Sequence, residues 1–227
     1  MDPIIAFLNK IIAAQLPAIT QAAQNGIRSA GLDPMGSVVS GHETLGSIDL
    51  GIGSASVGAD YSVSSLAGLS SIVIDTLAIT SGGTDPNDPS AVSGTVVLDA
   101  HLGQTLTARV GGGLDASLLF IHKSVGVSGQ ATVSGVTATG TGSFTAKISG
   151  SQLCLTRVSL SSLSLNYGGA SIDIDGLGFF NSFLSPLEDL VLDALKGTIR
   201  SGIADAVRPV LNDQVNSLLP LCADMPG

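Results

Sequence analysis

Residues 92–110 read VSGTVVLDAHLGQTLTARV, and the alternation of their side chains decides the fold. Every second position is apolar except Gly94 and Gln104, which is the pattern of a β-strand with one buried face. A straight strand of this length would span roughly 60 Å, whereas a compact chain of 227 residues has a radius of gyration of roughly 17 Å. The strand must therefore curve strongly or kink. Its apolar positions are Val92, Val96, Leu98, Ala100, Leu102, Leu106, Ala108 and Val110.

The alternation continues on both sides of this stretch. Residues 37–175 are predicted to form an antiparallel β-meander, because apolar residues alternate with Ser, Thr and Gly along most of the segment. The parity of the apolar positions changes between Ile74 and Leu77, which predicts a β-bulge there. The three glycines at 111–113 predict a sharp turn.

An amphipathic helix is predicted over residues 3–30, ahead of the strands. Asp2 can cap this helix, and Pro3 suits its first position. Apolar residues then recur at steps of three or four, which places them on one stripe. A curved sheet with one apolar face needs something to wrap around, and this helix is one of two candidates.

The second candidate is a helical region over residues 179–220. Its apolar residues also keep a helical period, and Pro186 suits a first turn. Gly197, Gly202 and Pro209 predict kinks or a division into two helices. The fold class is therefore α+β, with a long, strongly curved antiparallel sheet wrapped around N- and C-terminal helices in a single domain, 1–227.

Composition limits the classes of partner. The net charge is −9 with only nine Lys and Arg residues, so binding to nucleic acid or to anionic lipid surfaces is not expected. No run of 18 uninterrupted apolar residues occurs, so stable membrane insertion is not expected either. Trp is absent and aromatic residues are 4% of the chain, which predicts a core with smooth aliphatic walls.

The two cysteines, Cys154 and Cys222, are too far apart for a metal-binding spacing. They are either two unrelated buried thiols or one disulfide that ties the C-terminal helix to the sheet. We favour the disulfide, because both residues lie at the ends of predicted elements. A disulfide implies an oxidising compartment.

Residues that could carry chemistry are few. The histidines, His42, His101 and His122, match no zinc or haem spacing, and we interpret them as surface or edge residues. Asp173 and Asp175 share one face of a strand and could hold a cation, but a solvated outer face explains them more simply. No nucleophile elbow or phosphate loop is present, so the chain is not expected to be an enzyme and no cofactor is expected.

This organisation resembles the tubular lipid-binding (TULIP) superfamily, which includes bactericidal/permeability-increasing protein, the PLUNC proteins, takeout and juvenile-hormone-binding proteins and mite group 7 allergens. The segments 179–187 and 203–219 look like the C-terminal helix region of that group. The placement of Cys154 and Cys222 is similar to the strand-to-helix disulfide of several members. The resemblance implies long apolar ligands held between helix and sheet.

We therefore interpret the chain as a secreted, non-enzymatic carrier of an elongated apolar molecule such as a lipid, fatty acid, sterol, terpenoid or carotenoid. The candidates for lining a tubular cavity are Ile12, Leu16, Ile19, Leu98, Leu102, Leu106, Phe144, Leu190, Leu195 and Ile199. Two alternatives stay open. One is a surface-active or structural extracellular protein whose helices leave the sheet at an interface. The other is an enzyme whose site is assembled from distant strands.

Overall fold

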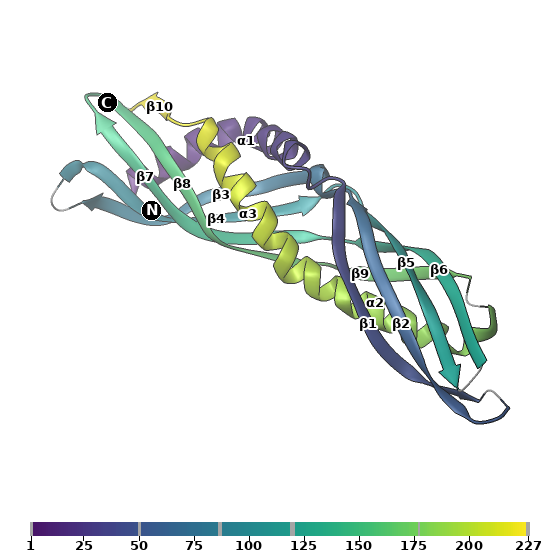
Figure 1. Cartoon of the computed structure of the whole chain (residues 1–227). Coiled ribbons are helices and arrows are strands. Elements are labelled where there is room, and N and C mark those ends of the chain that lie inside the picture. Colours follow the sequence, from purple (N-terminus) through teal and green to yellow (C-terminus); the bar gives the residue numbers. More distant parts are fainter. Residues whose placement is uncertain (1, 50, 86–87, 119–120, 177, 226–227) are drawn as a thin grey trace.

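A computed structural model describes residues 2–49, 51–85, 88–118, 121–176 and 178–225. It shows an elongated molecule with two five-stranded antiparallel sheets at opposite ends (Figure 1). The helices are α1 (Pro3–Ser29), the 3-10 turns η1 (Leu69–Ser71) and η2 (Gly178–Phe183), α2 (Leu184–Thr198), the π-helical segment η3 (Ile199–Ile203) and α3 (Ala204–Ser217). The strands are β1 (Met35–Asp49), β2 (Ser54–Ala67), β3 (Ile72–Asp85), β4 (Asp88–Leu102), β5 (Leu106–Leu118), β6 (Ile121–Ser134), β7 (Thr137–Ser149), β8 (Gln152–Asn166), β9 (Gly169–Asp175) and β10 (Leu221–Asp224).

The two sheets share one meandering chain. Sheet A has the strand order β1-β2-β5-β6-β9, and sheet B has the order β10-β8-β7-β4-β3. The chain makes a hairpin within one sheet and then crosses to the other, so four short links join the sheets. These links, residues 68–71, 103–105, 135–136 and 167–168, form what we call the waist.

Residues 92–110 make one of these crossings. Their first part is β4 of sheet B, their last part is β5 of sheet A, and the chain leaves regular strand geometry at 103–105. The predicted kink is therefore confirmed. The sequence pattern does not show the position of the kink, because Leu102 and Leu106 keep the same parity across the link.

The predicted turn at 111–113 is wrong. These glycines lie inside β5, where Gly112 pairs with Tyr61 of β2 and with Val127 of β6. A Cβ atom on Gly112 would collide with the carbonyl oxygen of Asp60, so glycine here permits close strand pairing. The predicted bulge after Ile74 is confirmed by a register shift between Ile74 and Thr76.

The N-terminal helix α1 forms as predicted. The Asp2 carboxylate accepts a hydrogen bond from the Ile4 N–H at 2.8 Å, and Gly31, with φ of 69°, follows the last turn. Within the described residues α1 is the one helix with the length and apolar composition that a bilayer span needs, two properties that core helices share. Here α1 packs against β3 and α3.

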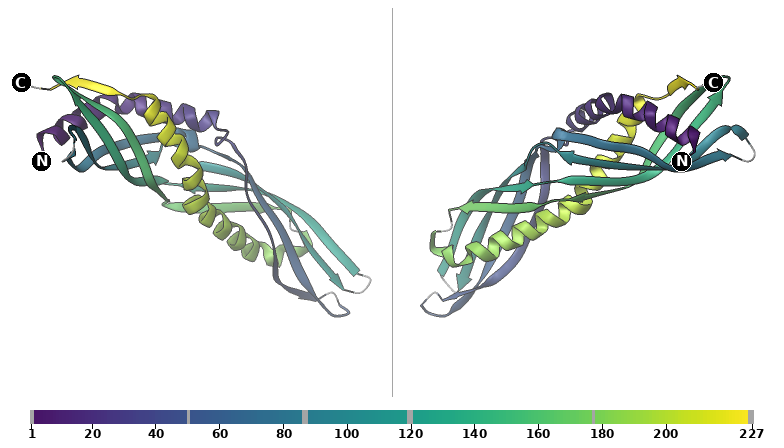
Figure 2. Two further views of the ribbon diagram at one scale, coloured as in Figure 1. Left: turned by 60° about the vertical axis from the view of Figure 1, so that its left-hand side comes forward. Right: turned by 180° about the vertical axis from the view of Figure 1, so that it is seen from behind.

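The C-terminal helical region runs along the molecule from one sheet to the other (Figures 1 and 2). Its first part, α2, packs on β1, β2 and β9 of sheet A, and its last part, α3, packs on β8 of sheet B. The predicted division near Gly197 and Gly202 is confirmed, because η3 lies between α2 and α3, whereas Pro209 lies inside α3 and does not divide it. A π-helical turn is uncommon inside a helix and often marks a functional position.

Helix side chains cover the free backbone edges of sheet B. Asn9 of α1 both donates to the Ile79 carbonyl (3.0 Å) and accepts from the Ile79 N–H (2.7 Å). Asn212 of α3 does the same for Leu160 of β8, at 3.1 and 2.7 Å. These amides replace the missing strand partners, which satisfies the backbone groups and blocks edge-to-edge pairing.

The predicted disulfide is confirmed: Cys154 and Cys222 are bonded, with their Cα atoms 4.0 Å apart. Cys222 follows the last helix, beyond the predicted helical region 179–220. It lies in β10, directly opposite Cys154 of β8 in the ladder. The bond therefore joins strand to strand beyond the end of α3.

The interior is one continuous hydrophobic core, and within the described residues it buries no polar or charged side chain. Leu, Ile, Val and Ala dominate it, as the lack of aromatic residues predicts. The core extends through both sheets and all three α-helices, so it passes through the waist.

Candidate functional site

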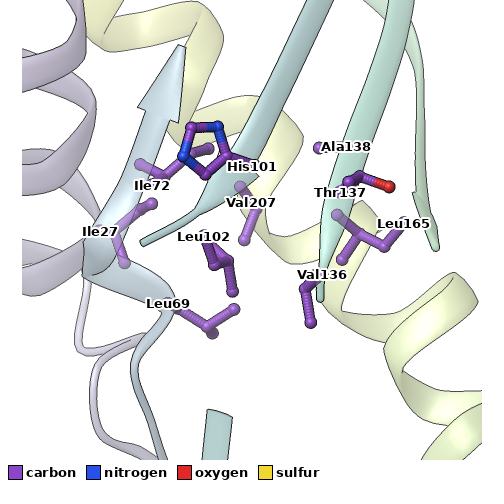
Figure 3. A pocket seen from close by; sticks show the side chains of 10 residues that line it. All are labelled: Ile27, Leu69, Ile72, His101, Leu102, Val136, Thr137, Ala138, Leu165 and Val207. Atoms are coloured by element: carbon purple, nitrogen blue, oxygen red, sulfur yellow. The ribbon is translucent and has the colours of Figure 1, made fainter. Parts of the chain in front are cut away.

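An apolar pocket lies at the waist (Figure 3). Side chains from α1, η1, β3, β4, β7, β8 and α3 surround it, together with Val136 of the third link. Its volume is about 20 Å³. The lining residues are Ile27, Leu69, Ile72, His101, Leu102, Val136, Thr137, Ala138, Leu165 and Val207.

The backbone at the waist holds this pocket in place. The Leu102 N–H donates to the Val136 carbonyl (2.9 Å), and the Gly103 N–H donates to the Ser71 carbonyl (2.9 Å). The Ser71 hydroxyl accepts from the Gln104 N–H at 3.1 Å. Three of the four links are therefore tied to each other or to β4 around the pocket.

Asp33, just after α1, fixes the first link. Its carboxylate accepts hydrogen bonds from the N–H groups of Gly68 (2.9 Å) and Ser70 (2.6 Å). Partial burial by itself would raise the pKa of Asp33, but the bonds from Ser70 and Gly68 and the charge of Arg28 together outweigh it. The pKa of Asp33 therefore lies below its ordinary value.

Polar groups enter the pocket lining from the outer face of sheet B. His101 and Thr137 are opposite each other on β4 and β7, and Figure 3 shows the His101 ring above Leu102 and Val207. The Nδ1 atom of His101 lies 2.7 Å from Oδ2 of Asp75 on β3. The His101 side chain is 45% exposed, so one end of the pocket reaches solvent.

The pocket is too small for a lipid as it stands. A volume of about 20 Å³ holds about one water molecule. Most of the side chains predicted to line a tube belong to the hydrophobic core. Those that are at most 2% exposed are Ile12, Ile19, Leu98, Leu106, Phe144, Leu195 and Ile199.

The other three predicted lining residues are partly exposed. Leu102 lines the waist pocket, Leu16 lines an open groove between α1 and β3, and Leu190 lies half-buried on α2. Contact of any of the ten with a ligand stays a prediction.

Sequence reasoning found one residue of the pocket, Leu102, and missed the others. The missing signal was glycine: each of the four links contains one, at Gly68, Gly103, Gly135 and Gly168. Gly68 and Gly135 have φ values of 108° and 62°, which other residues rarely adopt. A glycine by itself does not identify a crossing, however, because Gly94 and Gly112 lie inside β4 and β5.

The remaining candidate groups do not converge on the pocket. The side chain of His42 pairs with Asp60 at 2.8 Å on sheet A, and His122 is exposed on β6. Asp173 and Asp175 are exposed on β9, as the solvated-face interpretation predicts. Within the described residues no three His, Cys, Asp or Glu side chains are grouped as metal ligands would be.

Several solved structures match this fold, among them two that cover most of this chain. Takeout 1 of Epiphyas postvittana has a TM-score of 0.44 and 12% identity, over 95% of this chain and 93% of that chain. A lipopolysaccharide binding protein has a TM-score of 0.41 and 15% identity, over 85% of this chain and 38% of that chain. No protein-family model matches the sequence, and no curated protein matches it.

The predicted fold class is confirmed. The chain has the N-terminal helix, the long curled antiparallel sheets and the C-terminal helix of that architecture. The two matches are distant and concern the fold alone, so neither one assigns a ligand to this chain.

Proposed function

We propose that the protein is a secreted, non-enzymatic carrier of an elongated apolar molecule. The observation that carries the proposal is the apolar pocket at the waist, whose walls are formed mostly by residues of the continuous hydrophobic core. A ligand there would be bound by burial of apolar surface, worth about 25 cal/mol per Å² before the costs of association. The Cys154–Cys222 disulfide supports an oxidising, extracellular setting.

Binding requires the pocket to enlarge. The waist suits this change, because regular strand pairing stops at the four links and each link contains a glycine. The π-helical turn η3 lies just before α3, which contributes Val207 to the pocket. A lipid, fatty acid, sterol, terpenoid or carotenoid would fit the chemistry of these walls.

The test is titration of N-phenyl-1-naphthylamine, an apolar fluorescent probe, into the folded protein. We expect saturable binding with a micromolar or lower Kd, and displacement by lipid. Leu102→Trp should weaken binding at least tenfold, because an indole ring exceeds the space at this wall, and should cost about 1–3 kcal/mol of stability.

Leu45→Trp is the matched control, because Leu45 is a half-buried leucine on β1 of sheet A. It should leave probe binding unchanged. Absence of saturable binding by several chemically different probes would refute the carrier proposal, and equal weakening by both variants would place the site away from the waist.

A surface-active role is the second candidate, and α1 favours it. Lys10 and Arg28 are the only charged residues of this 27-residue helix, and side chains of Asn9, Thr20 and Gln24 bond it to β3. At an interface α1 could leave sheet B and spread its apolar stripe. A fall in surface tension at low protein concentration, without saturable probe binding, would support this role over the carrier.

A further inference from the structure

In the Asp75–His101 pair, at the open end of the waist pocket, the hydrogen-bond donor and acceptor can be assigned. An ionised carboxylate only accepts hydrogen bonds, so the Nδ1 atom of His101, 2.7 Å from Asp75, must carry the proton. In the neutral ring the second nitrogen, Nε2, is then an acceptor. Within the described part of the chain no hydrogen bond of the protein involves Nε2, and the side chain is 45% exposed.

The surrounding charge is negative. Asp75 lies beside the ring, and Asp99 is exposed on the same outward face of β4, two residues before His101. A carboxylate end of a ligand would meet both side chains at close range, and like charges repel. Thr137, the residue opposite His101 on β7, carries no charge.

We propose that the carried molecule ends in a free hydroxyl group, which donates a hydrogen bond to Nε2 of His101 while the apolar body lies along Leu102, Val136 and Leu165. The proposal rests on the carrier function proposed above. It selects alcohols of long chain or sterol type over fatty acids, because the alcohol supplies a donor and the acid supplies a negative charge.

Three probes of equal chain length test this selection: 1-dodecanol, dodecanoate and 1-methoxydodecane, each displacing N-phenyl-1-naphthylamine at neutral pH. The ether can accept but not donate a hydrogen bond, so it isolates the donor. We expect dodecanol to bind about threefold to tenfold more tightly than the ether, the range of one net hydrogen bond. Dodecanoate should bind more weakly than dodecanol.

Variants locate the effect. His101→Leu removes the acceptor and should equalise dodecanol and the ether, whereas His101→Gln keeps an acceptor oxygen and should retain part of the preference. Asp75→Asn removes one carboxylate and should improve the relative binding of dodecanoate. His42→Leu is the control, because His42 forms the corresponding pair with Asp60 on sheet A.

The outcomes separate the two proposals. If wild-type protein binds none of the probes, the carrier function itself fails. If it binds all three equally, or if His101→Leu keeps the preference for dodecanol with an unchanged denaturation midpoint, the hydroxyl selection is overturned and the carrier function stands.

Discussion

The backbone N–H of Leu102 donates a hydrogen bond to the carbonyl of Val136 at 2.9 Å, and this bond joins the end of β4 to one of the links between the sheets. Leu102 ends β4, and Val136 lies in the link between β6 and β7. The side chains of both residues line the waist pocket. The point where sheet B stops and the point where the pocket begins are therefore the same.

The disulfide should contribute strongly to stability. Cys154 and Cys222 are 68 positions apart, and closing a loop of that size is worth about 4 kcal/mol in the chain-entropy model. The double variant Cys154→Ala/Cys222→Ala should lose stability of this order in urea denaturation. Titration of the unfolded, unreduced wild type should find no free thiol. Two free thiols would show that the bond does not form in solution.

The asparagines that cover strand edges should contribute more to the free energy of unfolding than exposed asparagines do. Asn212→Leu leaves the N–H and carbonyl of Leu160 without their partner, so we expect a loss of about 2 kcal/mol in the free energy of unfolding. Asn181→Leu, at an exposed position, should change it by no more than about 0.5 kcal/mol. Equal effects of the two variants would contradict edge covering.

Asp33 should make stability depend on acidic pH. The pKa of Asp33 is lowered in the folded state, so its contribution is complete above the unfolded pKa of about 3.9 and is lost as pH falls through the folded value. Asp33→Asn should cost about 1 kcal/mol at neutral pH, given partial exposure of the site. Denaturation midpoints of the two proteins should converge at low pH. A constant difference between them would rule out the role of the Asp33 charge.

Two glycines of the β3–β4 hairpin provide a matched pair. A Cβ atom at Gly94 would collide with the Ser81 carbonyl oxygen and with Gly82, whereas at Gly83 it would meet no atom within 4 Å. Gly94→Ala should therefore destabilise by about 1–3 kcal/mol, and Gly83→Ala should be neutral or slightly stabilising. Thermal melts would show the difference, and similar melting temperatures would contradict this pairing of β3 with β4.

The sequence alone determined the elements and much of their arrangement. Apolar periodicity predicted α1, the meander and the C-terminal helical region, because each regular structure repeats its buried face at its own period. Gly197 and Gly202 predicted the division of that region. The change of parity between Ile74 and Leu77 predicted the bulge. The pairing of Cys154 with Cys222 was also predictable, since the chain offers no other cysteine.

Only the tertiary structure decided that there are two sheets and where they part. Leu102 and Leu106 keep one parity across the crossing, so the alternation is that of a single strand. The sequence pattern placed the turn at the glycines 111–113, whereas the chain leaves β4 at Gly103 and the three glycines pair within β5. The pocket could not be predicted either, because Ile27, Leu69, Leu165 and Val207 come together only when helices and strands distant in the chain pack. Periodicity reports which face of an element is buried. The element that packs against this face is determined by long-range packing, which a local sequence pattern does not predict.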